Sequence, residues 1–320
     1  MGQLMRRYWM PALLSEELPE PDCPPVQVRM MGEELVAFRD SSGRVGLLAE
    51  HCAHRGTSLF YGRNEDCGLR CAYHGWKYDV EGNVLDTPAE PEGSTFKGKV
   101  SQPWYPTCEA AGMVWAYLGP AAKKPAFPRY AFMDVPSSHS YVTKALLECN
   151  YLQGLEGECD SAHLNFLHRS FDRQGRDLYD QSSMPKYETE ETDFGLRLIA
   201  LRAAPEDKTY VRVSSFVMPI TCWISAITKE MHIYVPVDDQ HAWRYDFGYY
   251  PNRPATAADS HRSPEIGPDY RRIRTQANHY LIDRQRQKTR DFTGIENFLN
   301  HGAMATETMG PLYDRSKEHL

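Results

Sequence analysis

The fold is decided by two short stretches, Cys52-Ala-His-Arg-Gly56 and Cys71-Ala-Tyr-His-Gly-Trp-Lys-Tyr-Asp79. Each places one cysteine and one histidine close together beside a glycine that favours a tight loop. Two such loops can hold a metal centre between them. Zinc sites with two cysteines and two histidines usually pair like with like, whereas each loop here offers one of each. The pattern favours a [2Fe–2S] cluster in which two thiolates bind one iron and two imidazoles bind the other.

The composition around these motifs is that of an ordinary globular protein. The chain has 320 residues, 41% hydrophobic and 25% charged, which allows one large or two ordinary domains and excludes general disorder. A net charge of −7 argues against a dedicated nucleic-acid-binding protein. The longest apolar run is interrupted by Pro219 and is too short to cross a bilayer, and the N-terminal stretch has no apolar signal-peptide segment. We therefore expect a cytoplasmic protein that binds neither nucleic acid nor membrane.

The eight cysteines are sparse in a chain that is too long to need disulfide bonds for stability. A secreted disulfide framework is therefore not expected. Cys67 lies four residues before Cys71 and is interpreted as a bystander of the metal motif.

Hydrophobic patterning divides the chain into two parts. Residues 26–120 consist of short β-forming segments separated by turns, which predicts an all-β domain, and the proline-rich residues 120–136 predict a linker. The second part predicts an α+β domain with an antiparallel sheet flanked by helices, with helical patterns over residues 145–171 and 268–290. Strands are expected at 27–30, 34–38, 113–118, 196–200, 210–213, 232–235 and 243–249.

A second group of metal-binding side chains lies in residues 150–168. Asp160 and His163 are three residues apart and would meet on one face of a helix. His163 and His168 are five residues apart, about 140° around a straight α-helix. If both histidines bind one metal, the helix must end, widen or kink between them. A polar face exposed to solvent is the alternative explanation.

The two motifs, in this order, resemble the oxygenase (alpha) component of Rieske non-haem iron ring-hydroxylating oxygenases, in their phthalate-dioxygenase-like branch. The resemblance covers nearly the whole chain. It implies an N-terminal Rieske domain with its linker (residues 1–137) and a helix-grip-like catalytic domain (residues 138–320) that lacks part of its C-terminus. By this resemblance Cys52, His54, Cys71 and His74 bind the cluster, and His163 and His168 bind a mononuclear iron. Asp160 becomes the catalytic residue that touches His163 and reaches His74 of a neighbouring subunit.

The chain departs from this family at the third iron ligand. A two-histidine iron site normally includes one carboxylate. In this branch the Asp lies between two stretches that are present here as Phe292-Thr-Gly-Ile295 and Glu307-Thr-Met-Gly-Pro311. The spacing from either flank places the ligand at Gly302, which has no side chain. Three explanations are open. The carboxylate was lost or removed from this chain, or water, His301 or Glu296 fills its position in the site. The third is that the alignment register with the family differs from the one that the two flanks give.

The resemblance also implies the reaction and its partners. The expected activity is hydroxylation of an aromatic substrate by O2, with electrons from NAD(P)H relayed through a flavin and iron–sulfur reductase to the cluster and then to the iron. No dinucleotide-binding glycine motif is present, so a separate reductase is required. The family's electron path between subunits implies a homotrimer or a multiple of trimers. Carboxylated or aryl-ether substrates are expected, and Arg197, Arg202 and Arg212 are candidate carboxylate contacts, unless they are surface or ion-paired arginines.

Two other functions remain open at this point. One is an electron-accepting Rieske protein whose mononuclear site is empty or inactive because of Gly302. The other is a zinc-bound structural module, which would be colourless where a Rieske protein is brown. The sequence does not distinguish insertion of one oxygen atom from insertion of two.

Overall fold

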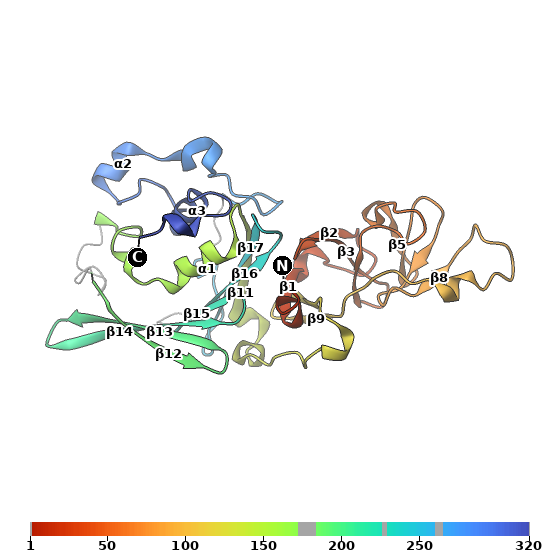
Figure 1. The fold of residues 1–320 in the computed structure, drawn as a ribbon, viewed down its shortest axis with the longest axis horizontal. Helices are drawn as coiled ribbons and strands as arrows, with labels where there is room; N and C mark the ends of the chain where they lie inside the picture. Colours follow the sequence, from red (N-terminus) through yellow and green to blue (C-terminus); the bar gives the residue numbers. More distant parts are fainter. Residues whose placement is uncertain (1, 172–183, 226–228, 260–264, 320) are drawn as a thin grey trace. The chain divides into compact units, whose positions relative to one another are not determined.

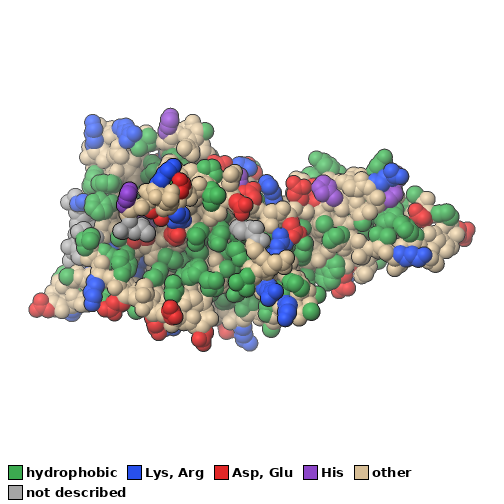
Figure 2. Space-filling view, in the orientation of Figure 1, with side chains coloured by type: hydrophobic (Ala, Val, Ile, Leu, Met, Phe, Trp, Pro, Cys, Tyr) green, Lys and Arg blue, Asp and Glu red, His purple; other side chains and the backbone are tan. Residues whose placement is uncertain are grey.

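The computed structural model describes residues 2–171, 184–225, 229–259 and 265–319, which form two compact units (Figure 1). The first unit spans Met1–Asp134 and the second Val135–Leu320. None of the helices in these described ranges is both long and apolar enough to cross a membrane. Acidic and basic side chains are interspersed over the visible face of each unit (Figure 2).

The first unit is built from three small antiparallel sheets, as the patterning of residues 26–120 predicts. In spatial order they are β1-β10-β9, β2-β3-β4 and β5-β6-β7-β8. The strands are β1 Trp9–Leu14, β2 Val26–Met30, β3 Glu33–Arg39, β4 Val45–Ala49, β5 Arg63–Glu65, β6 Gly68–Arg70, β7 Lys77–Tyr78, β8 Val84–Asp86, β9 Thr107–Ala110 and β10 Met113–Tyr117.

The core of the first unit continues into the metal motif. Phe38, Leu48 and Leu69 are fully buried and belong to one hydrophobic cluster with Cys52 and Cys71. The hydrophobic effect that folds this unit therefore also fixes the backbone on which both cysteines lie.

The second unit contains a seven-stranded antiparallel sheet in the order β11-β17-β16-β15-β14-β13-β12. The predicted strands lie within strands of this sheet or of the first unit, except that the one expected at 113–118 ends one residue earlier, at Tyr117. The strands are β11 Ser140–Leu147, β12 Lys186–Thr192, β13 Gly195–Ala204, β14 Lys208–Val217, β15 Thr221–Ser225, β16 Lys229–Pro236 and β17 Ala242–Tyr249, and the helices are α1 Tyr151–Cys159, α2 Arg284–Thr289 and α3 Phe298–Glu307.

Helix α1 lies against β16, and α3 packs on α1 (Figure 1). Gly154 allows the close approach of α1 to the sheet, since a Cβ there would come within 2.4 Å of the Tyr234 ring. Leu155 of α1 and Ala303 of α3 share one hydrophobic cluster with Tyr234. This packing brings the segment after α1 and the middle of α3 to the same side of the sheet.

The prediction of a helix over residues 145–171 is wrong at both ends. Residues up to Leu147 pair with β17 instead, because that strand supplies backbone hydrogen bonds and a buried face. Asn150 accepts the Leu152 N–H and starts α1, which ends at Cys159 with Asp160 as its C-terminal cap. A separate 3-10 helix, Ala162–Asn165, carries His163. This 3-10 helix ends between His163 and His168, which is one of the arrangements expected if both histidines bind one metal.

The helix predicted over residues 268–290 is also much shorter than expected. Only Arg284–Thr289 forms an α-helix, which begins where the Asp283 carboxylate accepts two backbone N–H groups. Before it, the 3-10 helix Gln276–Leu281 contains residues with positive φ, among them Tyr280. Arg274, which the predicted helix included, is buried in an ion pair with Glu265.

Candidate metal centres and active site

The two cysteine–histidine motifs form two equivalent turns in the first unit. Cys52 follows β4 and Cys71 follows β6. In each turn the cysteine C=O accepts the N–H of a glycine four residues on, Gly56 at 2.8 Å and Gly75 at 3.1 Å. Both glycines have positive φ, +73° and +74°, which side chains with a Cβ rarely adopt. The tight loops expected from these glycines are confirmed.

The four side chains gather with their thiols inward and their imidazoles outward. Cys52 and Cys71 are each only 3% exposed, whereas His54 and His74 are half-buried. The two imidazole rings lie 4.6 Å apart between centroids, and the His54 ring stacks on Trp76 at 4.7 Å. Burial raises the pKa of Cys71.

Tyr78 extends this site by a contact that the sequence pattern does not reveal. Its hydroxyl lies 3.0 Å from the Cys52 Sγ and is buried with it. Cys67 lies outside the group, with its Sγ 3.3 Å from the Ser42 hydroxyl. Hydrogen bonds to a cluster thiolate tune the potential of the iron it binds, so Tyr78 is a candidate for that role.

In the second unit, the segment after α1 brings together Asp160, His163 and His168. One Asp160 oxygen lies 3.2 Å from the His163 Nδ1 and also accepts the His163 backbone N–H. The His163 and His168 rings are 5.2 Å apart at an angle of 68°. Burial, followed by the neighbouring His163 and His301, lowers the pKa of His168 to about 2, so its ring is neutral at physiological pH.

Tyr187, which lies far along the chain, holds this segment in place by two hydrogen bonds. Tyr187 of β12 donates to the second Asp160 oxygen at 2.9 Å and accepts the Ser161 N–H at 3.0 Å. Burial alone would raise the pKa of Asp160, but the hydrogen bonds from His163, the Ala162 N–H and Tyr187 hold it well below its usual range. Asp160 is therefore a fixed carboxylate.

The three arginines considered as carboxylate contacts are used differently. Arg202 of β13 is 1% exposed and donates to the Ser161 hydroxyl at 2.9 Å and to the Ser161 carbonyl at 2.6 Å. It therefore braces the segment that carries His163. Arg197 is paired with Glu190 at 2.9 Å, and both side chains are largely exposed. Arg212 is half-buried on β14.

A cavity of about 640 Å³ opens beside His163 in the second unit. Its wall is mainly aromatic and aliphatic, with Phe166, Tyr280, Ile295 and Met304 among the lining residues. Arg284, at the first position of α2, supplies a cation to the same wall. A volume of this size suits a small organic ligand.

Comparison with known proteins agrees with this arrangement of two metal sites. Residues 8–105 match the family model of the Rieske [2Fe-2S] domain, and residues 116–320 match the model described as LigXa C-terminal domain like. The phthalate 4,5-dioxygenase oxygenase subunit of Pseudomonas putida is 40% identical over 343 aligned positions, which cover 100% of this chain and 78% of that protein. The chain belongs to the Rieske oxygenase family.

Further comparisons place this Rieske oxygenase among enzymes. The 3-chlorobenzoate-3,4-dioxygenase oxygenase subunit of Comamonas testosteroni is 36% identical, with 100% of this chain and 81% of that protein covered. The crystal structure of dicamba monooxygenase bound to dicamba has the same fold, with a TM-score of 0.68 and 16% identity over 95% of this chain and 87% of that one. The protein is an oxygenase enzyme whose cofactors are a Rieske cluster and a mononuclear iron.

The residues of this Rieske oxygenase fit the cluster. The buried Nδ1 of His74 has no hydrogen-bond partner among the described residues, as expected of a nitrogen that binds a metal. Two buried thiols and two adjacent imidazoles are the donor set of a Rieske centre. The half-buried histidines place the imidazole side of the site toward the surface.

The second site fits iron less completely. Asp160 occupies the Nδ1 of His163, which leaves the Nε2 for a metal. In the described residues, no group of three or more His, Cys, Asp or Glu side chains is arranged to hold one metal ion, and this holds for both sites. Gly302 lies in the middle of α3, one residue after the buried His301. The position at which the family's carboxylate ligand is expected is therefore a helical glycine on α3, which has no side chain to bind a metal.

Proposed function

We propose that this protein is the oxygenase component that hydroxylates a carboxylated or aryl-ether aromatic compound with O2. The observation that carries the proposal is the combination, in one chain, of a thiol–imidazole loop pair with two neighbouring histidines, of which His163 lines a cavity. Cys52, His54, Cys71 and His74 would hold the cluster, and His163 and His168 the iron. When bound, these centres supply one-electron transfer and dioxygen activation. Residues 1–137 would form the cluster domain with its linker, and 138–320 the catalytic domain.

The chain's own residues prepare the second site. The Asp160 carboxylate fixes the tautomer of His163, and Tyr187 and Arg202 fix the backbone that carries both. The apolar cavity wall excludes water and receives the ring of a substrate. A substrate carboxylate would pair with Arg284, whose guanidinium donates to the neighbouring Gln287 at 2.9 Å.

Electrons would come from NAD(P)H through a separate flavin and iron–sulfur reductase. We further propose a homotrimer, or a multiple of trimers, in which Asp160 of one subunit reaches His74 of a neighbouring subunit. The half-buried position of His54 and His74 supports this route, since an electron must leave the cluster through an accessible face.

The test uses the full chain, loaded with iron without oxygen and combined with a phthalate-type reductase and NADH. Oxygen uptake is measured with phthalate, halobenzoates, vanillate and phenoxybenzoate, each beside its neutral amide. Uptake with an acid but not with its amide, with ¹⁸O from labelled O2 in the product, supports the proposal. Arg284→Gln should then raise the KM for the acid. A protein that holds three irons per chain and consumes no O2 with any acid contradicts it.

Gly302 favours a second candidate function, that of an electron-accepting Rieske protein with an inactive mononuclear site. Iron analysis of the loaded chain separates the two functions, since the cluster holds two irons and the second site one. Two irons per chain, with normal reduction of the cluster by the reductase, would support this second function. A colourless zinc protein would exclude both.

A further inference from the structure

His301 is a buried imidazole in direct contact with one of the proposed iron ligands. It lies on α3 and is 7% exposed. Its Nδ1 is 3.3 Å from the Nδ1 of His168, and the two rings are close to parallel, at 16°. Phe298, one turn earlier on α3, stacks on the His168 ring at 3.7 Å between centroids, and its own ring lies 6.4 Å from that of His301. Two side chains of one helix therefore contact the His168 ring, Phe298 by stacking and His301 at the Nδ1.

The second nitrogen of His301 decides the direction of this contact. The His301 Nε2 is 2.7 Å from the Ile295 carbonyl oxygen, so this nitrogen carries the hydrogen and donates it. Burial favours a neutral ring, whose Nδ1 is then an acceptor with a lone pair. Of the two facing Nδ1 atoms, the hydrogen must belong to His168. His168 then has its lone pair on Nε2, the nitrogen on the other side of the ring.

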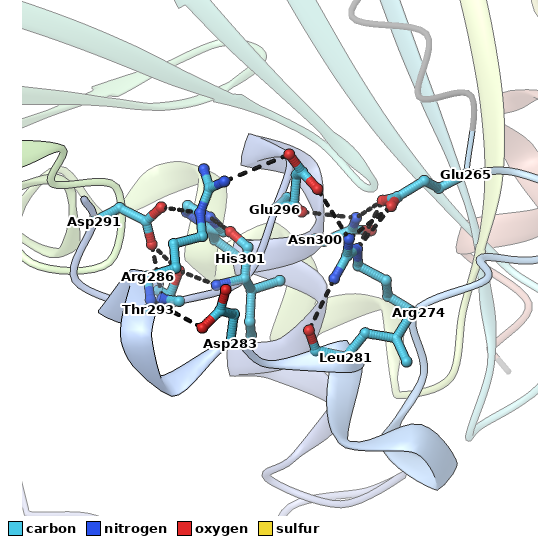
Figure 3. Close-up of polar contacts among 12 residues, drawn as sticks. Glu265, Arg274, Leu281, Asp283, Arg286, Asp291, Thr293, Glu296, Asn300 and His301 are labelled. Carbon is cyan, nitrogen blue, oxygen red and sulfur yellow. Dashed lines mark hydrogen bonds and ion pairs between the residues drawn. The ribbon is translucent and has the colours of Figure 1, made fainter. Parts of the chain in front are cut away.

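A charged network fixes the turn that carries the Ile295 carbonyl, and Figure 3 shows Arg286, Asp291 and Thr293 of this network. Arg286 of α2 forms an ion pair with Asp291, which is 5% exposed. Asp291 in turn accepts the Gly294 N–H at 2.7 Å, and Thr293 accepts the Ile295 N–H at 3.2 Å. These contacts hold the turn that presents the carbonyl to His301, so the tautomer of His301 follows from the fold.

We propose that His301 is a positioning residue that fixes the Nδ1–H tautomer of His168 and so directs the His168 Nε2 lone pair to the mononuclear metal. The chain of contacts runs from the Ile295 carbonyl through His301 to His168. In the same way, the Asp160 carboxylate fixes the tautomer of His163. The proposal rests on the assignment of His163 and His168 as metal ligands.

The test compares two variants of equal size, His301→Leu and His301→Asn. Both remove the ring, but the Asn Oδ1 takes the place of the Nδ1 and still accepts a hydrogen from His168. Full-length protein with its cluster is dialysed without oxygen against a series of Co(II) concentrations. Cobalt per chain then counts the second site alone, since the cluster contains iron. We expect His301→Leu to weaken cobalt binding by about 10- to 100-fold and His301→Asn to retain most of it.

Three measurements make the result decisive. Equal cobalt affinity in the Leu and Asn variants would overturn the proposal, because the acceptor would then have no role. Cobalt K-edge X-ray absorption of the unsubstituted protein should count two imidazoles, and three would overturn the proposal by making His301 a ligand. His168→Ala should abolish binding, and if it does not, the ligand assignment itself fails. His241→Asn, at an exposed turn between β16 and β17, is the control for loss of an imidazole elsewhere.

Discussion

At the scale of single residues, Gly302 has more consequences than any other position in the chain. It occupies the interior of α3, where glycine is destabilising relative to alanine. A Cβ added at this position would meet nothing within 4 Å. The helix therefore has room for a larger side chain beside His301, and the space itself does not explain why glycine stands here.

Gly302→Asp is expected to fold normally and to strengthen metal binding at the second site. The carboxylate would complete the set of two histidines and one acid that suits ferrous iron. We expect cobalt affinity to rise by at least about tenfold, since even outer partners of a metal site contribute that much. Equilibrium dialysis of the full chain measures the change, and reductase-coupled O2 uptake shows whether turnover rises with it.

The control at the same position is Gly302→Ala. It should stabilise α3 by about 0.5–1 kcal/mol without changing cobalt affinity, because it adds helix propensity but no ligand. Near-normal turnover of the unsubstituted chain, with no gain in Gly302→Asp, would show that the carboxylate is not missing from the site.

Local spacing in the sequence identifies the metal motifs but not the residues that brace them. Cys52 with His54, and Asp160 with His163, are close in sequence and therefore leave a visible pattern. Tyr187 reaches Asp160 only because β12 lies beside the segment after α1. That contact depends on sheet order, which no local pattern encodes, and the same is true of Arg202.

At the scale of elements, strands were predicted better than helices. Short runs rich in apolar and β-forming residues mark strands such as β16 and β17, whose described residues are nearly all buried. The helix predicted over residues 268–290 failed since its charged residues serve buried ion pairs. Arg274 contacts Glu265 and Glu296, and this network, rather than helix propensity, determines the backbone.

A buried ionic cluster joins α1 to the sheet. Arg244 of β17 is 6% exposed and pairs with Glu158 of α1 at 2.9 Å and with Asp246 at 2.7 Å. Arg244→Met leaves two buried carboxylates without their cation and should cost about 3–5 kcal/mol of unfolding free energy. Urea unfolding of the second unit measures the loss. Arg271→Met, in an exposed pair, is the control and should cost at most about 1 kcal/mol. Equal losses in both variants would contradict the role given to burial.

The same cluster predicts a pH dependence of stability through His232. Burial alone would lower its pKa, but Glu158 and Asp246 raise it above the usual value of 6.5, against the opposing charge of Arg244. A raised pKa means that the proton stabilises the fold below about pH 6.5 and that this stabilisation is lost as the pH rises through the raised value. The melting temperature of the second unit should therefore fall on alkaline titration. His232→Gln, which carries no proton to lose, should fall less, and an identical slope would contradict the assignment.

At the scale of the whole molecule, each compact unit carries one of the two proposed metal sites. The cluster motif lies in the core of the first unit, and the two histidines lie beside α1 and α3 of the second. Because the sites occupy different units, one can be removed without dismantling the other. Cys71→Ser should remove the cluster and spare cobalt binding at the second site, and His163→Ala should do the reverse.

This independence gives a test of the electron path between subunits. Each variant alone should be inactive, since every chain lacks one centre. Co-expressed in equal amounts, the two variants should regain about one quarter of wild-type O2 uptake if a cyclic trimer passes electrons from the cluster of one subunit to the iron of the next. In such mixed trimers half of the clusters and half of the iron sites are intact, so about one quarter of the cluster–iron pairs between neighbouring subunits are complete. A path within each chain predicts no recovery at all, so mixed assemblies that stay inactive, while each variant retains its remaining metal, would exclude transfer between subunits. Variants purified apart and mixed afterwards give the background.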